Sequence, residues 1–541
     1  MYSIKESFFE RKSLLVASCV SIILLTGCDD NNKDRKVSSS SSSSSLSSAS
    51  VSSSSSSNPS VSDSPYLGQW HAPAYGYVLS VSADSNSFTV KNYSVTTKDC
   101  LLQNVDSNLS LSDLKKDYLH SNTPTEMLQQ NIPDYLPAIT FKKLEAPPKV
   151  CEDNLQKVKT DAGYSFDAKK DFDIFWNAFN ELYVYFELRG MDWDKAYDDA
   201  LTSIDNVTNE TELFEFLSAV IAPLGDPHVM LLKAPLKPDL NKSLEEALTK
   251  ESTSLFYTET QETLYQQLLA EYLQTLGAKD ELTATQITAA ENYIAENSDK
   301  VRSNIFSYAD TSSDIEVRAA GEIAWFTTKD NMGYLLIDSM SEYSEEQSGV
   351  FSGMDADIAI AEATINEALQ DLANTDGLII DVRFNDGGHD QVSIAFVRHF
   401  MSRSQVVYSK FAGSGALQTP RKDVVLEPAD KNLYLKPTAV LVSGDTVSAA
   451  ELFVIAMASL PQVAIVGEPT AGAFSDILIK RLTSDIAFGI SNETYLDTLG
   501  NNYEGIGIPA DIAVPFATPE ERNGGYDSGI DQSINWIKQA P

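Results

Sequence analysis

One serine in this chain stands at a place where a hydroxyl group could do chemistry. Ser448 follows an apolar stretch at residues 438–442 that predicts a buried strand, and an apolar helix is predicted directly after it at residues 449–460. A hydroxyl at such a junction lies at a helix N-terminus, where free N–H groups favour developing negative charge. Ser448 also forms the pattern Ser-x-x-Glu with Glu451, which is a capping box. It is therefore a nucleophile or a helix cap, and this fragment alone favours the cap.

A serine nucleophile needs a base, and histidine is suited to that role at neutral pH. Two of the five histidines follow turns: His228 ends the turn 225–228, and His389 follows a glycine pair. A single histidine in a turn is more often structural than catalytic. The turns alone leave both histidines open as the base.

The glycine pair, Gly387 and Gly388, follows a predicted strand at residues 377–382. Ligands of open α/β sheets collect at the carboxyl ends of strands, so this turn is expected to face Ser448. Glycine allows backbone N–H groups to point into a site. Together with the N–H group of Ala449, these two glycines are predicted to form an oxyanion hole.

The elements that position these residues fall into successive segments. A β-rich pattern gives way to aromatic residues at helical spacing, then to a polar helical stretch, and finally to short apolar strands that alternate with helices. The last pattern predicts an α/β layer with a largely parallel, buried sheet. The expected segments are 1–27, an export signal; 28–64, a linker; 65–160, a small β domain; 161–235, a helical subdomain; 236–310, a helical insertion; and 311–541, the α/β core.

Four ordered motifs in residues 165–520 resemble the family of C-terminal processing (tail-specific) serine peptidases, in particular its tricorn-core branch. They are the glycine turn from Asp381 to Gly388, Ser448-Ala-Ala-Glu451, Gly467-Glu468-Pro469-Thr470-x-Gly472, and Tyr503–Pro509 followed by Asp511. The resemblance implies a ClpP/crotonase-like α/β core of layered sheet and helices, preceded by a helical subdomain and an N-terminal β domain. It also makes Ser448 the expected nucleophile.

Two catalytic schemes occur in that family, and the sequence distinguishes them. Where the processing branch has a lysine after the glycine, this chain has Ala473, and Lys480 lies seven residues further on, predicted to be misplaced along a strand. The tricorn-like scheme uses a histidine, which His228 matches, and a carboxylate that orients it, which Glu504 matches. The resemblance therefore implies a Ser448–His228–Glu504 site, with His389 as the rival base.

One departure concerns the residue before the histidine. Tricorn-like members carry a hydroxyl residue there, but this chain has Pro227, which has no group to donate. The fourth member of the relay is thus unassigned. The stretch where the processing branch carries a PDZ module is polar and helical here, so the family's C-terminal recognition is not implied.

Three functions compete on these residues. The first is a serine endopeptidase that acts on extended polypeptide. The second is a catalytically idle binding protein on the same fold, carrying an apolar ligand or peptide; retention of Ser448, His228 and Glu504 argues against it. The third is a surface adhesin that exposes Trp70, Tyr75 and Tyr77, which at strand spacing more often form a core.

The N-terminus predicts export and lipid anchoring. Basic residues precede an apolar run at residues 14–25, shorter than the roughly 20 residues that a membrane span needs. The run ends in Leu-Thr-Gly-Cys28, which resembles the lipoprotein cleavage box and implies a diacylglyceryl group on Cys28. Asp29 resembles a signal for inner-membrane retention. The expected location is the bacterial cell envelope, facing the periplasm.

The amino-acid composition limits the classes of partner that the protein is expected to bind. Asp and Glu number 77 against 40 Lys and Arg, so a net charge of −37 opposes nucleic-acid binding. Seventeen serines among residues 38–57 predict a flexible tether. Cys100 and Cys151 remain after Cys19 and Cys28 are accounted for, and they form a disulfide or stay as free thiols. No metal cluster or cofactor motif is recognised, so none is expected.

Overall fold

The computed structural model describes residues 64–540 apart from 85, 122–125, 131–137, 234–254, 258–262, 278–282 and 345–352. The predicted signal segment, Cys28, Asp29 and most of the serine-rich linker lie outside these residues. Within the described ranges, no helix is both long and apolar enough to cross a membrane. The same ranges hold no group of three or more His, Cys, Asp and Glu side chains placed to bind a metal ion.

The first described unit is an antiparallel sheet of seven strands in the order β4-β3-β2-β1-β7-β6-β5. Its strands are β1 (Gly68–Ala72), β2 (Tyr77–Ala83), β3 (Phe88–Val95), β4 (Cys100–Leu109), β5 (Tyr118–Ser121), β6 (Met127–Gln130) and β7 (Thr140–Leu144). Trp70 is fully buried among the apolar residues of this sheet. It is therefore a core residue and not part of an exposed aromatic face.

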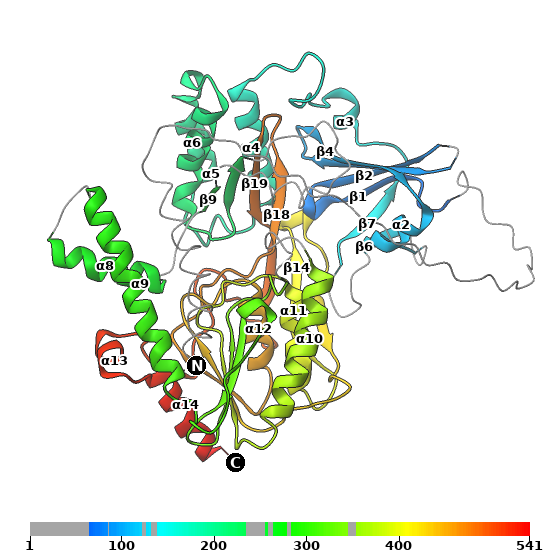
Figure 1. Cartoon of the computed structure of the whole chain (residues 1–541). Helices are drawn as coiled ribbons and strands as arrows, with labels where there is room; N and C mark the ends of the chain where they lie inside the picture. Colours follow the sequence, from blue (N-terminus) through cyan, green and yellow to red (C-terminus); the bar gives the residue numbers. More distant parts are fainter. Residues whose placement is uncertain are drawn as a thin grey trace, which may run out of the picture.

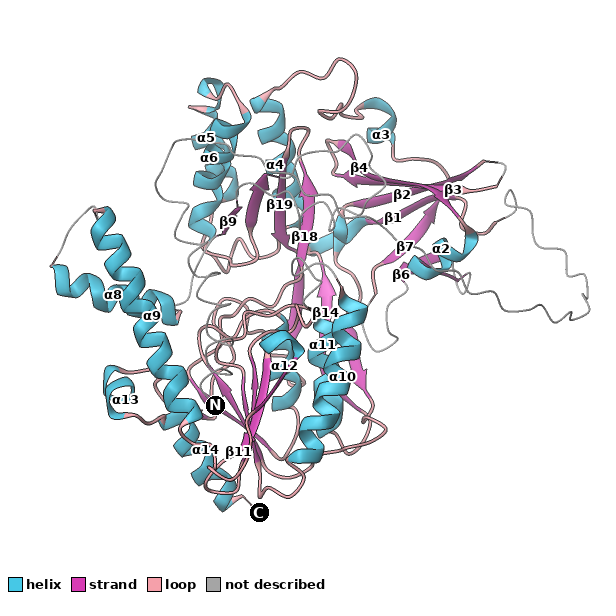
Figure 2. Cartoon of the chain, viewed as in Figure 1, coloured by secondary structure: helices cyan, strands magenta, loops and turns pink. Residues whose placement is uncertain are grey.

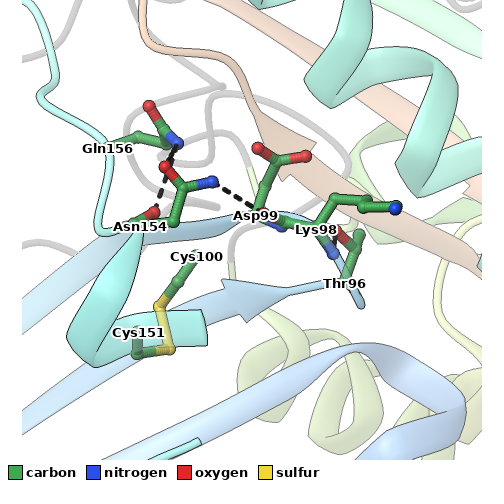
Figure 3. Close-up of a disulfide and its surroundings, with 7 residues drawn as sticks. All are labelled: Thr96, Lys98, Asp99, Cys100, Cys151, Asn154 and Gln156. Atoms are coloured by element: carbon green, nitrogen blue, oxygen red, sulfur yellow. Dashed lines mark hydrogen bonds between the residues drawn. A yellow bond between two sulfur atoms is a disulfide. The ribbon is translucent and has the colours of Figure 1, made fainter. Parts of the chain in front are cut away.

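A disulfide joins Cys100 at the start of β4 to Cys151 on α3 (Lys149–Asp153), as Figure 3 shows. It closes a loop of 51 residues. Of the two states that the sequence left open for this pair, the structure has the bonded one.

The helical subdomain follows, with α4 (Ala168–Leu182), α5 (Trp193–Leu201) and α6 (Glu210–Ile221). The aromatic face of α4 is buried, and Phe175 lies 4.9 Å from the ring of Phe488 on a later strand. Asn209 caps α6 by accepting hydrogen bonds from the N–H groups of Thr211 and Glu212. Two further helices follow, α8 (Leu264–Leu276) and α9 (Ala284–Phe306); α8 and the first half of α9 project from the rest of the chain in Figure 1, whereas the end of α9 packs into the core through Val301 and Ile305.

The core is a second seven-stranded sheet, in the order β10-β11-β12-β13-β16-β17-β21. All pairs from β12 to β21 are parallel. The strands are β10 (Glu316–Arg318), β11 (Ile323–Thr327), β12 (Gly333–Ile337), β13 (Leu378–Asp381), β16 (Thr438–Val442), β17 (Val463–Gly467) and β21 (Ile512–Ala513). The predicted bounds of β16, residues 438–442, are confirmed, and β13 is one residue shorter at each end than the predicted 377–382.

Helices cover both faces of this sheet (Figure 2). On one face, α10 (Met354–Asp371), α11 (Asp390–Val397) and α12 (Ala449–Ala458) pack against Leu378 and Ile380; on the other, α14 (Ser528–Gln539) packs with Ile379. Burial on both faces explains why these strands are continuously apolar rather than alternating. The fold class expected from the resemblance is confirmed.

Two smaller sheets were not predicted. One has the order β15-β14-β20, with β14 (Gln405–Ala412), β15 (Lys422–Leu426) and β20 (Glu493–Leu496). The other has the order β18-β19-β8-β9, with β18 (Ile477–Arg481), β19 (Ile486–Ser491), β8 (Met230–Lys233) and β9 (Leu255–Tyr257). In Figure 1, β18 and β19 lie between α4 and the N-terminal sheet. These strands join the helical subdomain to the core.

Candidate active site

Ser448 sits between β16 and α12 in a conformation that non-glycine residues rarely adopt, with φ of +56° and ψ of −123°. Its side chain is partly exposed, whereas most of α12 behind it is buried. A strained residue between a strand and a helix holds its side chain out of the helical path. This geometry suits a presented nucleophile better than an ordinary cap.

Gly387 lies against Ser448 so closely that a Cβ atom built on it would be 2.8 Å from the Cβ of Ser448. Gly388 touches the backbone of Met340, where a Cβ atom would be 2.5 Å from the carbonyl carbon. Both have positive φ, of +104° and +135°. Only glycine fits this turn without a shift of its neighbours.

The predicted oxyanion donors differ in what their N–H groups do. Gly387 donates its N–H to Asn385 Oδ1 at 2.9 Å, so this group is engaged in the structure. The β-bridge between Met340 and Gly388 consists of two hydrogen bonds, from the Met340 N–H to the Gly387 carbonyl and from the His389 N–H to the Met340 carbonyl. The Gly388 N–H takes part in neither of them. Ala449 is the first residue of α12, so its N–H has no acceptor within the helix. Gly388 and Ala449 are the better-placed pair.

Glu451 does more than the capping role that its position predicts. It accepts the N–H of Ser448 at 3.2 Å, the hydroxyl of Thr470 at 2.6 Å, and the N–H groups of Gly472 and Ala473 at 2.7 Å each. Burial of this carboxyl raises its pKa to about 7, against the hydrogen bonds that favour its ionised form. Glu451 thereby ties the start of α12 to the segment 470–473.

His228 is buried, with 6% of its surface exposed, and its Nδ1 atom has no hydrogen-bond partner among the described residues. It lies two residues before β8, in a turn where Asp226 accepts its backbone N–H at 3.0 Å. Burial lowers the pKa of the imidazole, while the charges of Asp226 and Asp476 and a hydrogen bond to the Ser475 backbone act in the opposite direction. A neutral, poised imidazole can act as a base.

Glu504 is buried but does not have the direct contact with His228 that the resemblance implied. One carboxylate oxygen accepts the N–H groups of Phe474 at 2.9 Å and Ser475 at 3.2 Å, and the other accepts Arg189 Nη2 at 3.2 Å. These donors satisfy the carboxylate, which explains why it is not turned toward the imidazole. Burial raises its pKa well above the usual range.

The segment 470–475 connects the three residues. The N–H groups of Gly472 and Ala473 donate to Glu451 beside Ser448. The N–H groups of Phe474 and Ser475 donate to Glu504, and the Ser475 backbone hydrogen bonds with His228. Ala473 takes part through its backbone, with its side chain fully buried. The structure therefore brings Ser448, His228 and Glu504 around one stretch of backbone.

Lys480 is unsuited to act as a base on Ser448. It lies on β18, as expected, and its ammonium donates to the carbonyl oxygens of Tyr75 at 2.6 Å and Gly76 at 3.2 Å in the N-terminal sheet. Burial lowers the pKa of this lysine well below its usual value. Its role is to join two parts of the fold.

His389 is the residue before α11, where its side chain makes no capping hydrogen bond, and its Nε2 lies 3.4 Å from Asp357 Oδ2. Asp357 also accepts the N–H groups of Glu342 and Tyr343. His389 Nε2 is buried and has no hydrogen-bond partner among the described residues, as is also true of His228 Nδ1. Sequence reasoning missed Arg189 and Asp476, because neither belongs to the motifs and their partners are distant in the chain.

Residues 331–514 match the profile of peptidase family S41, and residues 167–222 match the tricorn protease C1 domain. The part of the chain that holds Ser448 is thus similar to peptidase family S41. Members of this family are serine-type hydrolases. A carboxy-terminal-processing protease from Bartonella bacilliformis is 28% identical over 157 residues, which cover 29% of this chain and 35% of the relative. The match thus spans about a third of that S41 relative.

A solved structure shares the fold of this chain. A crystal structure from Parabacteroides merdae, described as a peptidase, superposes with a TM-score of 0.50 at 22% identity and covers 69% of this chain and 97% of its own. At that identity the likeness concerns the fold alone.

Proposed function

We propose that this chain is a serine endopeptidase that hydrolyses peptide bonds of extended polypeptides with Ser448 as the nucleophile. The observation that carries the proposal is the conformation of Ser448, held at positive φ beside Gly387 and at the N-terminus of α12. The match of residues 331–514 to the S41 family supports the same reaction class. His228 is the base, because it is buried, has a lowered pKa and lies at the segment that leads to Ser448.

In the proposed reaction, His228 takes the proton of the Ser448 hydroxyl as its oxygen attacks the carbonyl carbon of the substrate. The Gly388 and Ala449 N–H groups stabilise the oxyanion, and the proton then passes to the leaving amine. Glu504 acts through the Phe474 and Ser475 peptide groups, which it holds in place. Water hydrolyses the acyl-enzyme with the same base.

Labelling with a fluorophosphonate, followed by peptide mapping, tests the nucleophile. The probe should modify Ser448 in the wild-type protein, and Ser448→Ala should be neither labelled nor able to cleave casein. An unlabelled wild-type protein that binds an apolar ligand or peptide would favour the idle binding protein instead.

We further propose that the protein is anchored in the cell envelope by a lipid on Cys28 and faces the periplasm. The support is the Leu-Thr-Gly-Cys sequence after a short apolar run. Cys28→Ser should leave an uncut precursor or release soluble protein, and globomycin should block maturation. Unmodified Cys28 in protein extracted from membranes would contradict this.

A further inference from the structure

The helical insertion, formed by α8 and α9, is packed against the core at the start of α8 and the end of α9. Leu268 of α8 and Val301 and Ile305 of α9 are buried in the same apolar cluster as Leu441 of β16, the strand that leads to Ser448. These two ends of the insertion are therefore fixed parts of the fold. Each of them also makes a polar contact with a loop of the candidate active site.

The first contact joins the start of α8 to the loop that presents Ser448. Asp445 lies three residues before Ser448, and its Oδ2 atom accepts the N–H of Leu264 at 2.9 Å. Leu264 is the first residue of α8, so this N–H has no acceptor within its own helix. The cap residue Thr263 accepts the N–H of Gln266, which leaves the Leu264 N–H to Asp445. A carboxylate is also favoured at this end of the helix dipole.

The remainder of the loop before Ser448 is fixed to the end of β13. Ser443 Oγ donates to the Arg383 carbonyl at 2.6 Å, and Thr446 Oγ1 donates to the Val382 carbonyl at 2.8 Å. Asp445, which lies between these two residues in the chain, contacts the insertion instead. The loop is thus held by the core sheet and by α8 together.

The second contact joins the end of α9 to the glycine turn. The Arg302 guanidinium lies 4.5 Å from the centroid of the Phe384 ring, and its Nη1 donates to Asp338 Oδ2 at 2.8 Å. Phe384 begins the turn that contains the glycine pair, and Asp338 lies two residues before Met340, whose backbone forms the β-bridge with Gly388. One arginine therefore contacts both segments that this bridge joins. The Arg302 and Asp338 side chains are only 14% and 2% exposed, so their ion pair is little screened by water.

We propose that the helical insertion holds the nucleophile and the oxyanion donors in their relative positions, through Asp445 on the Ser448 loop and Arg302 on the glycine turn. Both are positioning residues, which act through Ser448 and Gly388. Displacement of reacting groups by about 1 Å can cost on the order of a hundredfold in rate, so small shifts of either loop matter. The inference rests on the proposed serine peptidase reaction.

The first test measures hydrogen exchange by mass spectrometry in a Ser448→Ala background, where the result does not depend on catalysis. Asp445→Ala should speed exchange in residues 443–450, because the loop loses its contact with α8. Arg302→Lys should speed exchange in residues 384–390, because a lysine keeps the positive charge but lacks the planar group that stacks on the ring. Unchanged exchange in either segment overturns the proposal, whatever the labelling of Ser448 shows.

Arg318→Lys is the matched control for Arg302→Lys. The Arg318 guanidinium also lies over an aromatic ring, 5.4 Å from the centroid of Trp325, and it pairs with Glu367. This arginine lies on β10, at the far edge of the core sheet from β21. Its substitution should leave exchange in residues 384–390 unchanged, and an equal increase there would overturn the proposal.

Kinetics of the protein with Ser448 intact give the second readout. Asp445→Ala and Arg302→Lys should each lower kcat and the rate of fluorophosphonate labelling about tenfold, with KM nearly unchanged. Asp445→Asn should restore most of the rate, because the amide oxygen can still accept the Leu264 N–H. A loss confined to KM would make the insertion a substrate-binding element and overturn the proposal.

Tyr293→Phe is the control for the insertion itself. It removes the hydrogen bond from the Tyr293 hydroxyl to Glu271, which joins α9 to α8 away from both loops, and it should keep full activity. A loss as large as that of Asp445→Ala would show a general effect of loosening the helices and overturn the proposal. A wild-type protein that the probe does not label contradicts the serine peptidase reaction instead, and the exchange measurement then decides the positioning role by itself.

Discussion

At the scale of single residues, Ser448 combines backbone strain with the proposed chemistry. A non-glycine residue at φ of +56° costs of order 1–3 kcal/mol, and this cost persists only where surrounding contacts hold it. The Glu451 carboxylate on the Ser448 N–H and the contact with Gly387 are such contacts.

We expect Ser448→Ala and Ser448→Asp to abolish casein cleavage while changing the free energy of unfolding by no more than about 0.5–2 kcal/mol. Ser448→Gly should be equally inactive but about 1 kcal/mol more stable than Ser448→Ala, because glycine tolerates positive φ. Urea unfolding and a casein assay measure both effects. Asn331→Gly is the control, since it relieves a similar φ of +59° away from the site and should keep full activity. Cleavage by Ser448→Asp would leave the helix cap as the explanation of this serine.

The burial of His228 predicts the pH dependence of the reaction. The base must be neutral, and burial lowers the pKa of its imidazole. Activity should therefore persist to a pH below the usual histidine range of about 6.5 and fall only as His228 becomes protonated. A profile of kcat/KM against pH measures this limb. His71→Gln is the control: burial also lowers the pKa of His71, but this residue lies on β1. An acidic limb that moves in His71→Gln, or that survives His228→Ala with activity intact, would contradict the assignment.

At the scale of elements, the close approach of the glycine turn to the start of α12 sets the shape of the site. Gly387 has no room for a Cβ atom, which would lie 2.8 Å from Ser448 Cβ and 2.9 Å from the Val447 carbonyl oxygen. Gly500 has a comparable φ of +91° but nothing within 4 Å of its Cβ position.

We expect Gly387→Ala to be more destabilising than Gly500→Ala and to reduce kcat, because the added methyl group displaces Ser448. Both variants carry the strain of a side chain at positive φ, so their difference isolates the contact with Ser448. Thermal unfolding and turnover of a peptide substrate measure the two effects. Equal stability and equal turnover in the two variants would show that this contact is unimportant.

At the scale of the whole molecule, the N-terminal sheet is fastened to the rest of the chain by contacts on β18 and β20, and the disulfide ties its edge strand β4 to α3. Closure of a 51-residue loop stabilises a protein by about 4 kcal/mol in the chain-entropy account, as an upper figure.

Replacement of both Cys100 and Cys151 by alanine should therefore lower the unfolding temperature of the N-terminal sheet. The double variant should match the wild-type protein after reduction, which differential scanning calorimetry can show. A double variant as stable as the oxidised protein would indicate that packing of the sheet, and not the disulfide, determines its stability.

Local patterns in the sequence were sufficient to predict strands and helices of the core. A continuous apolar stretch marked β16 with its observed ends, and the apolar run after Ser448 marked the start of α12. The aromatic spacing of α4 predicted its buried face. Each of these features depends on neighbours within a few residues, which is why periodicity and capping predicted them.

The surroundings of the proposed base depended on tertiary structure. Met230 on β8 pairs with Gly489 on β19, and the Tyr75 hydroxyl meets Glu493 across 418 residues of chain. The resemblance selected Glu504, but only the fold shows that Arg189 and two peptide groups occupy its oxygens. Hydrogen bonding and desolvation act through space between residues whose separation no local pattern records. The sequence by itself thus predicted the nucleophile and determined the strands and helices around it, whereas tertiary pairing decided which carboxylates lie near the histidine.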